Sequence, residues 1–221
     1  MTDWSMLQPV YFQAIGQTLI MVCITLLVGG FFGLVIGVLL YATREHGLLA
    51  NRTGYTALNV IVNIIRPIPF VIFMAAVAPL TLLVMGSTIG TTAALFPLSI
   101  AATFGISRIV EQNLVSVDPG VIEAARSMGA SPWRIIRTVL IPEALGPLIL
   151  GYTFVFISIV DMTAIAGAIG AGGLGNFAIQ YGYQRFNWTV TFIAIVTIVV
   201  IVQLVQYLGN KLSQKMLHRG K

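Results

Sequence analysis

Charge is what this sequence has least of. Charged residues make up only 9% of its 221 residues, whereas soluble globular domains carry about 25%. Residues 4–43 contain no charged side chain, and about 20 apolar residues are enough to cross a bilayer. The composition therefore excludes a soluble globular protein and predicts an integral membrane protein with a single membrane domain over residues 1–221.

Several groups that carry chemistry are also missing. Cys23 is the only cysteine, so no disulfide can form within the chain. No cluster of cysteine and histidine suggests a metal, no nucleophile lies beside a base, and no G-x-x-x-x-G-K-[ST] loop is present to bind ATP. We therefore expect a chain that is not an enzyme and has no cofactor. Residues 170–175 read G-A-G-G-L-G, but a dinucleotide site needs a preceding strand and a later acid, and the last acidic residue is Asp161.

Long apolar runs are what the sequence does have. They predict an all-α membrane protein with five transmembrane helices, at about 12–42, 55–85, 93–115, 144–167 and 189–209. The net charge of +5 does not indicate a nucleic-acid partner, because the basic residues flank the runs and form no stripe. The N-terminal stretch is not expected to be a removable signal peptide, since no basic residue precedes the first run.

The basic residues also predict the orientation of the chain. Ten of the twelve fall on one side of the predicted spans, and Arg185 alone falls on the other. Arg66 is set aside because it lies within a run. The ten include four in the C-terminal tail, namely Lys211, Lys215, Arg219 and Lys221. Since basic loops remain in the cytoplasm, we expect the N-terminus outside and the C-terminus in the cytoplasm.

Small residues and prolines mark two of the runs. Gly29, Gly33 and Gly37 recur every four residues in the first run, so they share a helix face and predict close helix packing. A glycine set that faces lipid is the alternative. The second run contains Arg66, Pro67, Pro69 and Pro79. Each proline removes a backbone donor, so this run is expected to kink or break.

The stretch 117–142 is the only long polar interruption, and it predicts two short helices with a joint. Asp118 can cap the first helix ahead of Pro119, and Gly129 can take the positive φ that ends it. Ser131 can cap the second helix, and Pro142 is expected to limit it. We expect one apolar face on each helix, formed by Val121, Ala125 and Met128 on the first and by Trp133, Ile136 and Leu140 on the second.

This stretch resembles a known family motif. E-A-A at 123–125, Gly129, and V-L-I-P at 139–142 resemble the EAA loop in the membrane subunits of bacterial ABC importers of type I. The resemblance implies a cytoplasmic loop that docks onto a separate ATPase subunit, and the charge distribution independently predicts the same side. The coupling residues it implies are Glu123, Ala124, Ala125, Arg126, Gly129, Ser131, Trp133, Arg134, Arg137 and Pro142.

Further motifs resemble the methionine-uptake branch of these permeases. They are R-P-I-P-F at 66–70, G-A-I-G-A-G-G-L-G at 167–175 and Q-Y-G-Y at 180–183; that branch more usually has serine at position 67. The implied gate-region glycines are Gly167, Gly170, Gly172, Gly173 and Gly175. The resemblance also implies a homodimer in the bacterial plasma membrane, two copies of an ABC ATPase, and an extracytoplasmic methionine-binding protein or lipoprotein.

Four residues are candidates for a substrate path. Asp161 departs from the family pattern, and a charge within a span costs about 2.5–3.5 kcal/mol, so it should face a cavity or a partner. It meets either a substrate ammonium group or, in the reading we favour, another polar group. Arg66 meets a substrate carboxylate or stabilises the broken span. Met74 and Met162 line the path for a thioether or, more simply, pack in the core.

Other classes of function remain open. A secondary transporter would need an ion-coupling site and usually internal repeats, and neither is seen. A membrane scaffold would not need an E-A-A loop. Within the ABC class, another amino acid or a small polar solute is the alternative substrate. Five spans without a repeat make a poor path on their own, which favours a homodimer.

Overall fold

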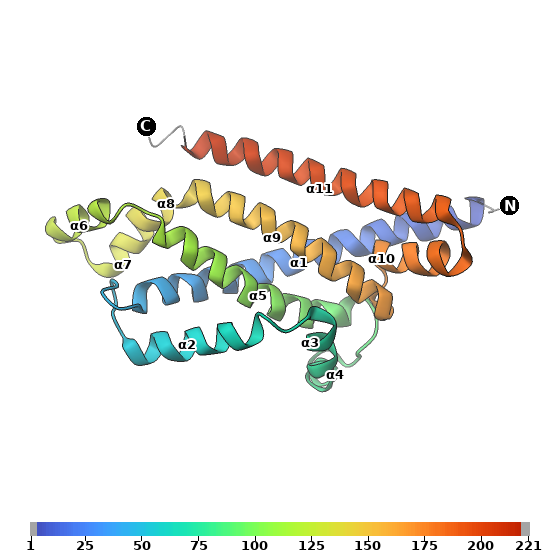
Figure 1. Ribbon diagram of the computed structural model, residues 1–221, viewed down its shortest axis with the longest axis horizontal. Coiled ribbons are helices and arrows are strands. Elements are labelled where there is room, and N and C mark those ends of the chain that lie inside the picture. Colours follow the sequence, from blue (N-terminus) through green and yellow to red (C-terminus); the bar gives the residue numbers. More distant parts are fainter. Residues whose placement is uncertain (1–3, 218–221) are drawn as a thin grey trace. The chain divides into compact units, whose positions relative to one another are not determined.

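The structure is a computed structural model that describes residues 4–217, and within this range it contains helices and no strand. The prediction of an all-α protein is therefore confirmed (Figure 1). The described residues form two compact units. The first unit contains residues 4–30, 68–102 and 156–205, and the second contains 31–67, 103–155 and 206–217. Arg219 and Lys221, two of the basic residues behind the predicted orientation, lie outside the described residues.

Four long helices are apolar enough to cross a membrane, and each contributes residues to both units. They are α1 (Trp4–Thr43), α5 (Thr91–Val115), α9 (Leu145–Ala166) and α11 (Trp188–Leu217). The region of the second predicted span, at about 55–85, is different. Helices α2 (Arg52–Ile65) and α3 (Phe70–Ala76) are bent by 107° across a short break, as in a broken span or a re-entrant loop.

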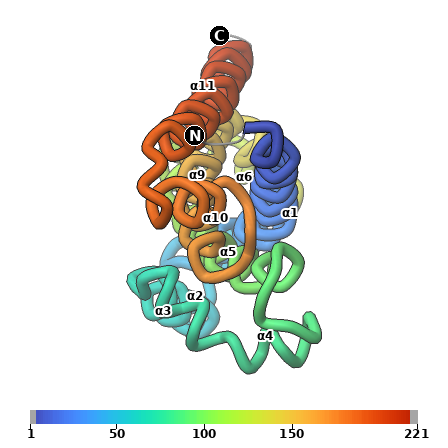
Figure 2. Tube along the Cα trace, turned by 90° about the vertical axis from the view of Figure 1, so that its right-hand side faces the viewer, coloured from blue at the N-terminus to red at the C-terminus, as the bar shows by residue number. Residues whose placement is uncertain are grey.

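The prolines of this region account for the break. Pro67 and Pro69 lie between α2 and α3, where each lacks the N–H that would continue the helix. Pro79 has a different effect, because it lies in the first turn of α4 (Ala78–Met85), where that N–H is not needed. Figure 2 shows α3 and α4 as short coils on the chain before α5. The predicted disruption is therefore concentrated at the first two prolines, and the third begins a helix.

The first unit is built around the short helix α10 (Gly173–Phe177), which packs against α1 and α11. One buried cluster there contains Leu7, Ala14, Leu174, Phe177, Val190 and Ala194. Two polar side chains of α1 support α10 directly. Gln17 Oε1 accepts from the Gly173 N–H at 2.7 Å, and Thr18 Oγ1 accepts from the Leu174 N–H at 2.8 Å. These bonds satisfy donors that a helix start leaves without partners.

In the second unit, glycines allow α1 and α5 to pack closely. A Cβ atom at Gly33 would lie 2.6 Å from Ile106 Cβ, and one at Gly37 would lie 2.6 Å from Val110 Cβ. No ordinary side chain fits at either position, so both glycines are at a helix contact and do not face lipid. Gly29, four residues earlier in the first unit, is also buried.

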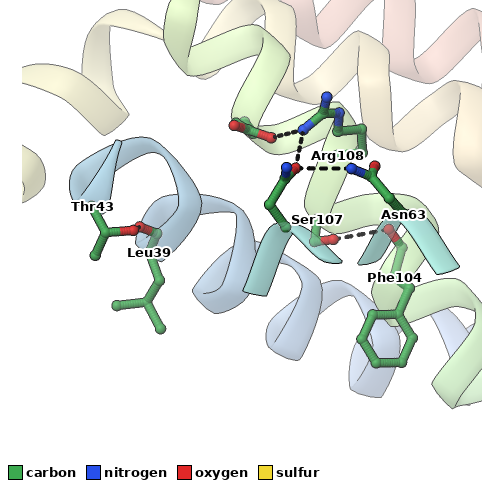
Figure 3. A network of polar contacts seen from close by, with 8 residues as sticks. Leu39, Thr43, Asn63, Phe104, Ser107 and Arg108 are labelled. Carbon is green, nitrogen blue, oxygen red and sulfur yellow. Dashed lines mark hydrogen bonds and ion pairs between the residues drawn. The ribbon is translucent and has the colours of Figure 1, made fainter. Parts of the chain in front are cut away.

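A polar cluster joins α2 to α5 in the same unit (Figure 3). Arg108 Nη1 donates to Glu111 Oε2 at 2.6 Å and to Asn59 Oδ1 at 3.3 Å. Asn63 also donates to Asn59 Oδ1, at 3.1 Å. The side chain of Glu111 is only 8% exposed, so this buried charge has the paired and hydrogen-bonded surroundings that it requires.

Candidate functional site

The polar stretch after α5 forms a compact series of short helices in the second unit (Figure 1). It contains α6 (Pro119–Ser127), α7 (Pro132–Ile135), a π-helical segment (Ile136–Leu140) and α8 (Ile141–Glu143). The last three follow one another without a gap, so the stretch is in effect two helices with a joint at residues 128–131. This is the arrangement that the capping pattern predicted.

The start and end of α6 are confirmed in detail. Asp118 Oδ1 accepts from the Gly120 N–H at 2.8 Å, directly before the proline that opens the helix. Gly129 has a φ of +78°; its N–H donates to the Arg126 carbonyl at 2.9 Å, and the next N–H donates to the Ala125 carbonyl at 3.2 Å. These two bonds form a Schellman motif, which gives the joint a defined geometry.

Two expectations for the second helix are wrong. Ser131 occupies the N-cap position, but its hydroxyl makes no capping hydrogen bond. Pro142 does not end the helix, because it falls in the first turn of α8 after the π-helical segment. The wider π turn starts a new helical register there, so the missing proline N–H interrupts nothing.

The predicted apolar face of α6 is also wrong in part. Ala125 is buried as expected, but its buried neighbour is Ile122, whereas Val121 is 38% exposed and Met128 is 81% exposed. A tertiary contact accompanies this orientation of the helix. The Arg126 guanidinium donates to the Gly47 carbonyl at 3.2 Å, which holds that side of α6 against the loop after α1.

The second helix buries Ile136 and Leu140 as predicted, together with Ile135. Trp133 was assigned to the same face but is 67% exposed. It therefore contributes surface instead of core. Its ring lines an apolar groove against the C-terminal half of α1.

The exposed side of the loop carries charges that form no ion pair with the residues that the structure describes. Glu123, Ala124, Arg134 and Arg137 are exposed. Across residues 4–217 the one ion pair is Arg108–Glu111, so the three charged residues of this set take part in none. A surface of this kind is suited to binding another protein through charged and apolar contacts.

The glycine-rich segment after α9 belongs to the first unit, and its glycines have conformational roles. Positive φ angles occur at Gly170 (+107°), Gly172 (+82°) and Gly173 (+81°). A Cβ atom at Gly167 would lie 2.5 Å from a backbone oxygen, and Gly175 packs directly on the backbone of Ala164. Helix α9 precedes the segment, so the dinucleotide reading lacks the strand that it needs.

Two hydrogen bonds to its backbone carbonyls attach this segment to the start of α5. The Gly90 N–H donates to the Gly170 carbonyl at 3.1 Å, and the Thr91 hydroxyl donates to the Ala171 carbonyl at 2.8 Å. A cavity of about 320 Å³ lies in the same unit, lined by residues of α3, α4 and α5 and by Ile169.

The four candidate path residues separate into two groups. Met74 and Met162 both pack in a buried cluster with Met21, which agrees with ordinary core packing, although Met74 also borders the cavity. Asp161 is exposed on α9, and Arg66 is exposed just after α2. Neither charged side chain has an ion-pair or hydrogen-bond partner within residues 4–217.

Sequence reasoning missed the polar cluster around Arg108 and the support of α10 by Gln17 and Thr18. The available signal was the occurrence of polar residues inside apolar runs, as at Asn59 and Asn63. The sequence alone did not give the partners. Asn59 accepts from Arg108, 49 positions away, and Gln17 and Thr18 accept from residues 156 positions away. A metal site was not expected, and no group of three suitable ligands occurs in the part of the chain that the structure describes.

Apolar spanning helices and an exposed two-helix loop define the membrane component of a transport system. The chain belongs to the family of binding-protein-dependent transport system inner membrane components, whose family model matches residues 33–218. It is a multi-pass component of the bacterial inner membrane, distinct from any subunit that hydrolyses ATP.

Relatives with curated names cover most of the chain. The probable D-methionine transport system permease protein MetI of Vibrio cholerae is 43% identical over 203 residues, which are 92% of this chain and 90% of that protein. The methionine import system permease protein MetP of Bacillus subtilis is 44% identical over 175 residues, which are 79% of each chain.

Solved structures show the same fold. A chain of the MetNI methionine ABC transporter in an inward-facing conformation superposes with a TM-score of 0.93 at 39% identity, covering 98% of this chain and 99% of that one. A chain of an amino acid ABC transporter crystallised with histidines superposes with a TM-score of 0.79 at 21% identity, covering 97% and 99%. Because the identity to this second chain is only 21%, the similarity shows a shared fold and no more.

Proposed function

We propose that this chain is the permease subunit of an ABC importer for methionine. Two copies would form the transmembrane path, a pair of ABC ATPase subunits would drive it, and an extracytoplasmic binding protein would deliver the substrate. The observation that carries the proposal is the superposition on the MetNI permease chain over 98% of the sequence. The identities of 43% and 44% to permeases named for methionine support the same substrate.

Within this proposal, α6 and the helix that follows it are the coupling element. The loop is exposed, its charges are not paired within residues 4–217, and its joint is fixed by the Schellman motif at Gly129. A stiff pair of helices transmits a displacement, whereas a flexible loop would absorb it. We place the loop and the C-terminus in the cytoplasm, because ten of the twelve basic residues fall on that side of the spans.

The cycle follows from this arrangement. ATP binding brings the two ATPase subunits together, and the docked loops move with them. The spans then change from an inward-open to an outward-open state, in which the binding protein releases its substrate. The chain supplies the path and transmits the movement, and the ATPase supplies the free energy.

An uptake experiment tests the proposal. The chain is reconstituted with its ATPase in vesicles, with the binding protein added outside, and the entry of radiolabelled methionine is followed with and without ATP. ATP-dependent entry that unlabelled methionine inhibits is the expected result. Entry driven by a proton or sodium gradient without ATP would identify a secondary transporter. ATP-dependent entry of another amino acid, with no entry of methionine, would support an ABC importer but would show that its substrate is not methionine.

Asp161 is the residue of the path that we would test first. It is exposed on a spanning helix without a partner in residues 4–217, and a methionine zwitterion has an ammonium group that a carboxylate could bind. Asp161→Asn should lower uptake at limiting methionine by about tenfold, the size of one charged hydrogen bond, while Asp161→Glu retains most of it. Equal uptake by Asp161→Asn and the wild type would show that Asp161 does not bind the ammonium group of the substrate.

A further inference from the structure

The second unit contains an apolar groove beside the proposed coupling loop. One wall is formed by the C-terminal half of α1, with Leu34, Val35, Val38 and Leu39. The other wall carries Trp133 and Arg137 from the helix after the joint. The groove has a volume of about 190 Å³, and apart from the Arg137 side chain its lining is apolar.

The groove lies near the charged end of α1. Helix α1 ends at Thr43, and the first charged residues, Arg44 and Glu45, follow at once. Leu34 and Leu39 are nine and four residues before that end, which is about 14 and 6 Å at 1.5 Å per residue. An apolar run that is followed at once by charged residues is expected at a membrane–water interface.

The side chains at the groove match the chemistry of a lipid at a membrane interface. Arg137 is exposed, has no ion pair within the described chain, and combines an apolar stem with a guanidinium group that binds phosphate with two parallel hydrogen bonds. Trp133 is 67% exposed, and tryptophan is enriched at membrane interfaces because its ring is apolar and its N–H is polar. Val35 and Leu39 are 41% and 39% exposed on the floor.

We propose that this groove binds an anionic phospholipid, with an acyl chain along Val35, Val38 and Leu39 and the phosphate at Arg137. The choice of occupant follows from the charge of Arg137 and the apolar lining together. A second copy of the chain could cover the apolar floor, but it would not require an unpaired guanidinium at the rim. A bound lipid would also hold the helix that carries Trp133 against α1, and so would stabilise one arm of the proposed coupling loop.

Lipid retention tests this site directly. The chain is purified as its complex with the ATPase, transferred into vesicles of phosphatidylcholine with or without phosphatidylglycerol, re-extracted, and weighed by native mass spectrometry. Arg137→Gln removes the charge at the groove, and Val35→Trp fills the floor. Arg134→Gln is the matched control, because Arg134 is exposed one turn earlier on the same helix and does not line the groove.

The expected result distinguishes a specific lipid site from general electrostatic attraction between basic residues and anionic lipids. Arg137→Gln should lower the retained phosphatidylglycerol by about tenfold, and Val35→Trp should abolish retention of both lipids. Arg134→Gln should have at most the roughly fivefold effect of one surface charge near an anionic membrane. Equal losses in the two arginine variants would overturn the proposal. So would loss of ATPase co-purification by Arg137→Gln with lipid retention unchanged, since the groove would then bind the ATPase.

Discussion

The contact between α1 and α5 in the second unit gives the sharpest prediction, because a matched control lies on the same helix. A Cβ atom at Gly37 would be 2.6 Å from both the Ser107 carbonyl oxygen and Val110 Cβ. Ordinary contacts of this kind begin at 3.4 Å, so Gly37→Ala must separate the two helices by about 0.8 Å there (3.4 minus 2.6). Neither contacting atom is the end of a flexible side chain, so local rotation cannot relieve the contact.

Overpacking of this kind costs about 1–3 kcal/mol. In a protein of this size, 1 kcal/mol changes the melting temperature by about 2–4 °C, so Gly37→Ala should lower it by about 2–12 °C. Gly16 is also in α1, but a Cβ atom there would have nothing within 4 Å. Gly16→Ala should leave the melting temperature unchanged or raise it slightly, because alanine favours a helix by up to about 1 kcal/mol.

The assay is thermal unfolding of the purified chain in one detergent, followed by loss of its monodisperse peak in size-exclusion chromatography. Gly33→Ala should behave like Gly37→Ala, since its Cβ would lie 2.6 Å from Ile106 Cβ. If Gly37→Ala melts no lower than Gly16→Ala, the two helices are not in close contact at this position. The same result would restore the alternative that the glycines face lipid.

Three further predictions concern the loop and the polar cluster. A valine side chain at Gly129 would meet no steric contact, but it would place a β-branched residue at φ +78°, at a cost of about 1–3 kcal/mol. Gly129→Val should therefore lower uptake while the amount of protein in the membrane is unchanged. Gly129→Asn should retain uptake, because asparagine tolerates the left-handed region of φ and ψ. Asp118→Ala removes the cap of α6 and should lower the unfolding free energy by about 1 kcal/mol, measured by thermal melting. Glu111→Gln should destabilise the chain by about 1–3 kcal/mol in the same assay, and adding Arg108→Met should recover part of the loss.

Each of these has an outcome that contradicts it. Equal uptake in the valine and asparagine variants of Gly129 would show that the left-handed joint does not limit coupling. An unchanged melting temperature for Asp118→Ala would mean that tertiary contacts alone hold the start of α6. A double variant at Arg108 and Glu111 that is less stable than Glu111→Gln alone would show that Arg108 stabilises the fold mainly through Asn59.

Local sequence rules predicted the parts of the loop that depend on local geometry. Asp118 and Gly129 were assigned correctly because a capping carboxylate and a left-handed glycine act within a few residues of their position. The faces of α6 depend on something else. In a helix of nine residues, an apolar stripe through Ile122 and Ala125 is as good as one through Val121 and Ala125. The choice between them depends on the tertiary surroundings of the helix, which include the contact of Arg126 with Gly47, 79 positions away.

The same distinction applies to the spans. The prolines at 67 and 69 predicted a break because each acts on its own helix. The sequence did not decide whether Gly33 and Gly37 face lipid or a neighbouring helix, because a small residue is compatible with both. That choice depends on Ile106 and Val110, which no local pattern connects to the first run.

The charged residues near the spans point beyond a single copy of the chain. Arg108 and Glu111 satisfy one another inside the second unit, at 2.6 Å. Asp161 on α9 and Arg66 after α2 are exposed and have no partner within residues 4–217. A charge facing hydrocarbon costs about 2.5–3.5 kcal/mol, and two such costs would consume much of the stability of an ordinary domain. We infer that assembly removes these charges from lipid, by placing them along a hydrated path or against a partner subunit, as the proposed homodimer requires.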